Sequence, residues 1–398
     1  MGKQLKITIT DNLIFVLFSC WCLVDALNGL LLRNNLFSIS QIYKVLIAII
    51  IVVRCWDNRK IKGYVCAICF YLSFYIVNIA LHGEEVGASI ALVSKLLTSI
   101  LFFLYFTHVI RADENYFKSM AQKVFKWNFV FFAINMFLGI MGLGYAAYGE
   151  ADEGIGSKGF FYAGNELSGV VAAVFPWVFY YIRKNYSLIT YYVSGALLLI
   201  LVYTLSTKSG IFATLLLFVM IALFYGDRKT KNFTLLTFIT ALIYIVYHIQ
   251  SLLGAEVAIV ERFNFFLERD GLLNALTAGR LDYWEEESVE FYNSDVFTWI
   301  FGLGGMRTVE MDPPDSLLNC GLIGLIILLF FYIKGLSNPF KRYYANNPYK
   351  MVVFSSNLIL IIISISAGHI LFSSMAGMLI ALSNAMLFIK GKKRITIR

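Results

Sequence analysis

The stretch "EMDPPDSLLNCGLIGLIILLFFYI", residues 310–333, decides the fold class of this chain. It opens with three acids and two prolines and continues into a long apolar run. The hydrocarbon core of a bilayer is about 30 Å thick and takes about 20 apolar residues per helix. The run behind the prolines therefore predicts a transmembrane helix over 316–333.

Similar apolar runs recur along the chain of 398 residues, of which 59% are hydrophobic and 15% charged. Ordinary soluble domains carry about 45–50% apolar and about 25% charged residues. We therefore predict an all-α polytopic membrane protein with about twelve transmembrane helices. The expected spans are 12–32, 40–53, 63–81, 90–110, 124–146, 165–182, 187–205, 210–226, 232–250, 316–333, 351–368 and 370–389.

The basic residues predict the orientation, because cytoplasmic loops of membrane proteins are enriched in Lys and Arg. Placing both termini in the cytoplasm puts 24 of the 33 Lys and Arg residues on the inner side. Three parts result: residues 1–250 with the first nine helices, a large extracytoplasmic loop over 251–315, and residues 316–398 with the last three helices and a basic cytoplasmic tail. The net charge of +8 does not indicate nucleic-acid binding, because the basic residues border spans.

The loop 251–315 carries thirteen acids, four arginines and no lysine, a net charge of −9. A structureless connection of this length is unusual in a compact protein. Its segment "AGRLDYWEEESVEFY", residues 278–292, has the apolar spacing of an amphipathic helix. A guanidinium binds phosphate oxygens bidentately, which makes the loop arginines candidates for phosphate contacts.

The acids of the opening stretch have two interpretations. Pro313 and Pro314 end any helix arriving from the loop and allow a new one to begin behind them. Asp315 then falls at the expected N-cap of that new helix. Glu310 and Asp312 precede the break at the membrane surface, where a partly desolvated carboxylate is suited to act as a general base.

Polar residues within spans are costly and therefore informative. Lys44 is interpreted as a side chain that extends its amine toward the headgroups. Lys95, Lys208 and Glu166 lie toward the outer side and predict a polar cavity that opens there. The four histidines are too dispersed along the chain to suggest a metal site.

Five short motifs, taken in order, resemble those of the O-antigen ligase and O-antigen polymerase (Wzy-type) superfamily. They are "GNELSG" (164–169), "LSTKSG" (205–210), "AGR" (278–280) followed by Trp284, "GLGG" (302–305) and "EMDPPDSLLNCGLIG" (310–324). The resemblance covers about residues 155–335. It implies a GT-C-like glycosyltransferase architecture in the bacterial cytoplasmic membrane.

The resemblance also implies an enzyme that uses polyprenyl-diphosphate-linked oligosaccharides as substrates, without a cofactor or a metal. Ligases of the superfamily carry His where this chain has Glu310, so the acidic version is more similar to the repeat-unit polymerases of O-antigen, capsule or exopolysaccharide synthesis. The implied catalytic residues are Glu310, Asp312 and Arg280. The candidates for binding the diphosphate and the glycan are Lys208, Arg262, Arg307, Asn165, Glu166 and Trp284.

The implied partners are membrane lipid, a flippase and a chain-length regulator. Two alternatives stay open. A ligase would move the glycan to a different terminal acceptor. A lipid-linked oligosaccharide flippase or a secondary transporter would show two related halves, and no half-repeat is evident in the sequence.

Overall fold

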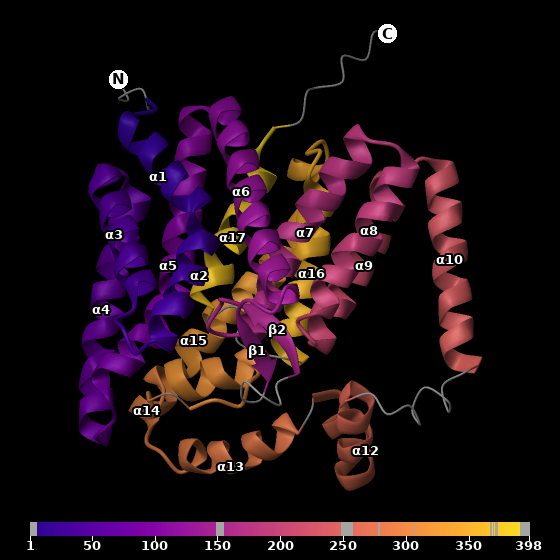
Figure 1. Ribbon diagram of the computed structural model, residues 1–398. Helices are drawn as coiled ribbons and strands as arrows, with labels where there is room; N and C mark the ends of the chain where they lie inside the picture. Colours follow the sequence, from indigo (N-terminus) through magenta and orange to yellow (C-terminus); the bar gives the residue numbers. More distant parts are fainter. Residues whose placement is uncertain are drawn as a thin grey trace.

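The computed structural model describes residues 6–148, 155–247, 258–277, 279–305, 307–366, 368, 370 and 373–390. Helices form almost all of this part of the chain (Figure 1). The first six helices are α1 (Ile9–Ser19), α2 (Trp21–Arg33), α3 (Ile39–Arg54), α4 (Arg59–His82), α5 (Val86–Ala112) and α6 (Glu114–Ile140). A short antiparallel hairpin of β1 (Tyr145–Tyr148) and β2 (Ile155–Gly159) follows.

The next four helices are α7 (Asn165–Asn185), α8 (Leu188–Tyr203), α9 (Lys208–Tyr225) and α10 (Arg228–Tyr247). Three helices then occupy the long connection, namely α12 (Ala258–Thr277), α13 (Arg280–Tyr292) and α14 (Val296–Phe301). The chain ends with α15 (Asp312–Ser337), the 3-10 turns η1 (Asn338–Phe340) and η2 (Arg342–Tyr344), α16 (Lys350–Ser366), α17 (Ser374–Ala385) and η3 (Met386–Phe388).

Each of the twelve expected spans overlaps a helix or, for the first, the pair α1 and α2, although 124–146 runs past the end of α6 into β1. Within the described residues, five helices are long and apolar enough to cross a membrane: α4, α5, α6, α9 and the segment Asp312–Phe340. The pair α1 and α2, bent by 52°, makes a sixth if it is one broken span. The protein is therefore a polytopic helical membrane protein, and the number of twelve crossings stays a prediction.

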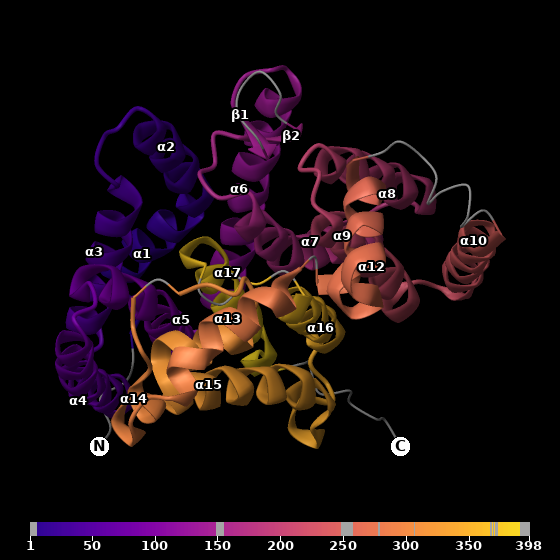
Figure 2. The ribbon, with the colours of Figure 1, turned by 90° about the horizontal axis from the view of Figure 1, so that it is seen from below.

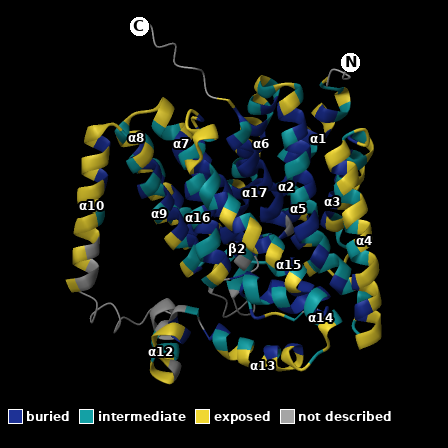
Figure 3. Cartoon of the chain, turned by 180° about the vertical axis from the view of Figure 1, so that it is seen from behind, coloured by how far each residue is buried: buried dark blue, intermediate teal, exposed yellow. Residues whose placement is uncertain are grey.

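The interior of the bundle is built around α7 and α17. Residues 167–177 of α7 are all buried, and α7 packs against α9, α16 and α17, while α17 also packs against α5. The peripheral helices α4 and α10 are largely exposed along their length (Figure 3). Their exposed side chains are mostly apolar, as expected for helix faces that contact lipid.

Two sets of contacts define opposite ends of the bundle. At one end, Arg54 at the end of α3 pairs with Asp11 of α1 at 3.0 Å, and the Lys390 amide donates to Glu114 at the start of α6. At the other end lie the hairpin and the helices α12, α13 and α14, which Figure 2 shows from below. The segments expected inside and outside are thus separated along the bundle axis.

The structure corrects the expected start of the tenth span. α15 begins at Asp312, with Pro313 and Pro314 in its first turn. First-turn amides have no acceptor within the helix, so a proline there loses no hydrogen bond. Asp315 is therefore not the N-cap, and it accepts instead from the Val309 amide, at 2.6 Å. α15 is also interrupted at Gly321, whose φ is +64°.

The interpretation of Lys44 is wrong as well. Its amine does not extend to the headgroups but lies 2.5 Å from the Asp25 carboxylate, and the two side chains are 9% and 7% exposed. The Asp25 carboxylate also accepts from the Ser40 hydroxyl. A charge inside a bundle is stabilised by a partner of opposite sign, and the carboxylate one helix away supplies it.

The topology predicts which face of the membrane each loop reaches. A cysteine at Asn293, an exposed position after α13, should react with an impermeant thiol reagent in intact spheroplasts of a strain whose protein lacks its six native cysteines. A cysteine at Tyr343, which is 75% exposed and expected to be cytoplasmic, should react only after the membrane is permeabilised. The reverse pattern would invert the orientation of the whole chain.

Candidate active site

Arg280 is held by the local backbone at the start of α13. Gly279 precedes it with φ of +82°, and a Cβ at Gly279 would lie 2.4 Å from the ring of Phe266, so only glycine fits there. The Arg280 side chain is nearly buried and 11% exposed. Its Nη1 donates to the carbonyls of Thr277 at 2.9 Å and Ser366 at 3.0 Å.

The other terminal nitrogen of Arg280, Nη2, forms an ion pair with Glu310. Arg280 Nη2 donates to Glu310 Oε2 at 2.9 Å, and the Glu310 side chain is 39% exposed. Arg280 Nε is buried and has no hydrogen-bond partner in the described part of the chain. The pair therefore combines an anchored guanidinium with a carboxylate that solvent and substrate can reach.

Glu310 has an unusual backbone. Its φ is +58°, in the left-handed region that costs a residue other than glycine about 1–3 kcal/mol. The neighbouring Gly368 packs on it so closely that a Cβ at Gly368 would lie 2.1 Å from the Glu310 carbonyl oxygen. Such strain persists where the surroundings hold it, and it is frequent at functional sites.

Asp312 lies close behind this pair but faces inward. Its side chain is fully buried and accepts from the Ile370 amide, at 3.1 and 3.2 Å, and from the Ser364 hydroxyl. This geometry favours a positioning role for Asp312, because a reacting hydroxyl cannot reach a carboxylate enclosed in this way. Glu310 is the more accessible of the two expected bases.

Glu166 joins the same region from α7. It lies in the first turn of that helix and accepts from the Ser373 hydroxyl at 2.6 Å. Lys208 begins α9 with an exposed side chain. Asn165 begins α7 and Arg262 lies on α12, and both side chains are outside the part that the structure describes.

The connection between α16 and α17 brings these residues together. Ser366, Gly368, Ile370 and Ser373 contact Arg280, Glu310, Asp312 and Glu166, in that order. This connection was not predicted from the sequence, because it acts through a carbonyl, a glycine, an amide and a hydroxyl. The sequence pattern that could have indicated this connection is the short "SAGH" interruption, residues 366–369, between two apolar runs.

Arg307 is placed apart from Arg280. It pairs with Glu84 at 2.9 Å, Glu290 at 2.8 Å and Glu287 at 3.6 Å, which ties α13 to the turn between α4 and α5. Trp284 packs partly buried against the apolar cluster beneath α13 and α14. That cluster contains Phe291, Leu303, Val309, Met311 and Leu318. Both candidates are thus engaged in holding α13 in place.

We expect Arg307→Met to lower stability more than activity. It leaves three acids without their cation, a loss of about 1–3 kcal/mol. The measurement is thermal unfolding of the purified protein in detergent, followed by activity per folded molecule. Loss of activity at unchanged thermal stability would instead place Arg307 on the substrate.

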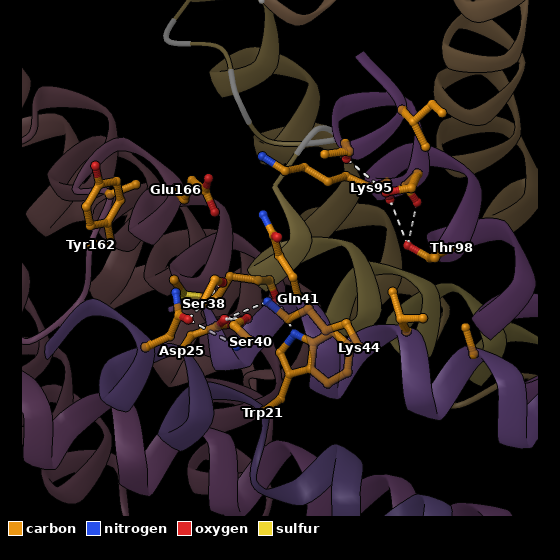
Figure 4. A pocket seen from close by; sticks show the side chains of 18 of the residues that line it. Trp21, Asp25, Ser38, Ser40, Gln41, Lys44, Lys95, Thr98, Tyr162 and Glu166 are labelled. Carbon is orange, nitrogen blue, oxygen red and sulfur yellow. Dashed lines mark hydrogen bonds and ion pairs between the residues drawn. The ribbon is translucent and has the colours of Figure 1, made fainter. Parts of the chain in front are cut away.

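A cavity of about 700 Å³ adjoins the site between α2, α3 and α5. Glu166, Gln41 and Lys95 line it from three different elements, and Figure 4 shows these three around its centre. The pair of Asp25 and Lys44 lines it below them. Lys95 and Glu166 therefore share a cavity as expected, but most of its lining is apolar and Lys208 does not line it.

Among the described residues, no group of three or more His, Cys, Asp or Glu side chains is placed to hold a metal ion. What the site offers is an anchored guanidinium, an accessible carboxylate and an adjoining open cavity along α3. Such a set can stabilise negative charge on a leaving group and accept a proton from a hydroxyl.

Comparison with known proteins relates the chain to one family of membrane proteins. Residues 14–264 match the family described as O-antigen ligase like membrane protein, and no curated protein matches the chain. The match ends before Arg280 and Glu310, so the roles of these two residues rest on geometry and on the motif resemblance. Because the match spans more than half of the chain, the protein belongs to the O-antigen ligase-like family of membrane proteins, which are glycosyl-transferring enzymes of O-antigen ligation or polymerisation.

Proposed function

We propose that this protein is a polysaccharide polymerase that joins polyprenyl-diphosphate-linked oligosaccharide repeat units at the outer face of the cytoplasmic membrane. The observation that carries the proposal is the ion pair between Arg280 and Glu310, anchored at 2.9 Å beside the connection between α16 and α17. Ligases of the resembled superfamily carry a histidine where this chain has Glu310. The carboxylate at that position makes the chain more similar to the polymerases, which transfer a glycan between two lipid-linked substrates.

In the proposed reaction the hydroxyl oxygen of the acceptor sugar attacks the anomeric carbon of the donor glycan. The new glycosidic C–O bond forms as the bond from that carbon to the diphosphate oxygen breaks. Polyprenyl diphosphate leaves with the bonding electron pair, and Arg280 stabilises its growing negative charge. Glu310 accepts the proton that the acceptor hydroxyl loses.

The pairing of Arg280 with Glu310 suits this sequence of events. A diphosphate that approaches Arg280 competes with the Glu310 carboxylate for the same guanidinium, and Arg280 Nε still lacks a partner in the described part of the chain. Binding of the donor would therefore release Glu310 toward the acceptor. Asp312 holds the connection between α16 and α17 against the site through the Ile370 amide.

The second candidate is a ligase that moves the finished glycan to a different terminal acceptor, and the description of the matched family favours it. Deleting the gene and running the surface glycan on a gel separates the two. A polymerase mutant retains single repeat units without polymer. A ligase mutant retains polymer that is no longer attached to its anchor, and that outcome would overturn the proposal.

Under this proposal both termini are cytoplasmic and the repeat units arrive on the outer face. A flippase must then supply them, and a chain-length regulator is the expected further partner. Glycan laddering that persists without any flippase would contradict the placement of the site on the outer face.

A further inference from the structure

Lys158, on strand β2, is a buried cation that the proposed reaction does not use. Its side chain is 6% exposed, and its amine has no hydrogen bond or ion pair with the residues the structure describes. Burial, together with the nearby Arg33, lowers the pKa of Lys158 below its usual value. A cation that is largely withdrawn from water is stabilised by an anion beside it, so the position favours a negatively charged partner.

The backbone around Lys158 is firmly placed. Asn135 of α6 donates to the Lys158 carbonyl at 3.2 Å and accepts from the Phe160 amide at 2.9 Å. A Cβ at Gly29 of α2 would lie 2.0 Å from the Phe160 carbonyl oxygen. The hairpin therefore packs directly on α2 and α6, and Lys158 is held between them and the start of α7.

Two further positive features converge near Lys158. Arg33, at the end of α2, lies with its guanidinium carbon 5.1 Å from the centre of the Tyr145 ring. The Lys158 Cδ atom is 3.9 Å from the position that a Cβ on Gly164 would take, and Gly164 is the N-cap of α7. Gly164 has no side chain to accept from the first amides of α7, and the N-terminus of a long helix attracts anions.

The nearby acids do not supply the missing charge in the described structure. Glu166, in the first turn of α7, accepts from Ser373 and forms no ion pair with Lys158 there. Glu150, Asp152 and Glu153 lie in the sequence between β1 and β2, outside the described residues. Within the described part of the chain, no carboxylate pairs with Lys158 or Arg33 beside the N-terminus of α7.

The cavity of about 700 Å³ begins beside this cluster, because Leu32 and Ala163 line it. It follows α3 from Ser38 to Val53, a rise of about 22 Å at 1.5 Å per residue. Ser38 and Gln41 line its outer part. The deeper α3 positions are apolar and are Val45, Ala48, Ile49, Val52 and Val53. The combination matches a lipid with an anionic head and a long hydrocarbon chain.

We infer that Lys158, Arg33 and the N-terminus of α7 bind the diphosphate group of a polyprenyl diphosphate lipid whose chain occupies the cavity along α3. The choice of a polyprenyl lipid rests on the proposed function, which requires two lipid-linked substrates at once. Arg280 then serves the diphosphate of one substrate, and the Lys158 site serves that of the other.

Native mass spectrometry of the purified full-length protein, titrated with polyprenyl diphosphate, tests this inference. In an Arg280→Gln background, which removes the other anion site, one bound lipid should remain. Lys158→Met should weaken that binding by at least about tenfold, since a charge-assisted contact is lost while the buried alkyl chain is kept. Lys158→Arg should restore it, and Lys60→Met, at an exposed position in the first turn of α4, should leave it unchanged.

Unchanged binding in Lys158→Met would overturn the inference. Equal loss of phosphatidylglycerol binding would overturn the assignment to a polyprenyl lipid, and inorganic pyrophosphate binding as tightly as the lipid would overturn the role of the cavity. Replacing Glu150, Asp152 and Glu153 by their amides should not weaken lipid binding, and a loss there would also contradict it. These readouts need no polymer formation, so they stand even if the proposed function fails.

Discussion

Glu310→Gln is expected to lower the rate of polymerisation by about 10²–10⁴-fold, the usual contribution of a positioned general base. The amide has nearly the same size and keeps a carbonyl oxygen to accept from Arg280, which donates to Glu310 at 2.9 Å. The backbone at position 310, with φ of +58°, strains glutamine and glutamate alike. The change therefore removes the ability to take a proton while the local structure is kept.

Glu290→Gln is the matched control. It makes the same substitution in another arginine–glutamate pair, with Arg307 at 2.8 Å, where the Glu290 side chain is 56% exposed. Exposed pairs contribute about 0–1 kcal/mol, so activity should be retained. The measurement is the initial rate on purified lipid-linked repeat units. Equal rates for the two variants would remove Glu310 from the mechanism.

Arg280→Lys is expected to be almost as damaging as Arg280→Ala, with a loss of about 10²–10³-fold in each. The guanidinium serves three acceptors at once, namely the Thr277 carbonyl, the Ser366 carbonyl and the Glu310 carboxylate. A single ammonium cannot reach all of them and also grip a diphosphate bidentately. The fork of the side chain, and not only its charge, is therefore required.

Arg269→Lys provides the control for this pair of variants. Arg269 joins α12 to α13 through Asp282, and both side chains are 47% exposed. Its replacement should leave polymer yield at matched protein level unchanged. If lysine at position 280 restores most of the activity, Arg280 acts as a point charge, and the bidentate contact with phosphate is excluded.

The helices could be predicted from the sequence because each depends on a local apolar run. Every expected span overlaps a helix, as for 63–81 within α4 and 90–110 within α5. The start of α15, at Asp312 instead of 316, was missed by four residues for a local reason too. Prolines are tolerated in a first turn, so Pro313 and Pro314 lie inside the helix that they were expected to precede.

The arrangement of the site could not be predicted from the sequence, because it depends on contacts between residues that are far apart in the chain. Arg280 meets the Ser366 carbonyl 86 positions away, and Glu166 meets Ser373 across 207 positions. Motif order identified Arg280 and Glu310 as candidates. It could not identify Ser366 or Gly368, since a backbone carbonyl and a close packing contact have no residue-type signature.

The burial of Lys158 could not be predicted from the sequence either. A lysine in a short polar segment is ordinarily solvated, and nothing in the sequence distinguishes it from its neighbours. Its burial results from the hairpin, which the all-α prediction did not include.

The most direct test of the proposed function uses the purified protein in lipid vesicles with lipid-linked repeat units as the only glycan. We predict a ladder of products that increase by one repeat unit, with one polyprenyl diphosphate released per bond formed, and no ladder with Glu310→Gln. Transfer that occurs only after a different terminal acceptor is added, without any ladder from the repeat units alone, would contradict the polymerase and identify a ligase.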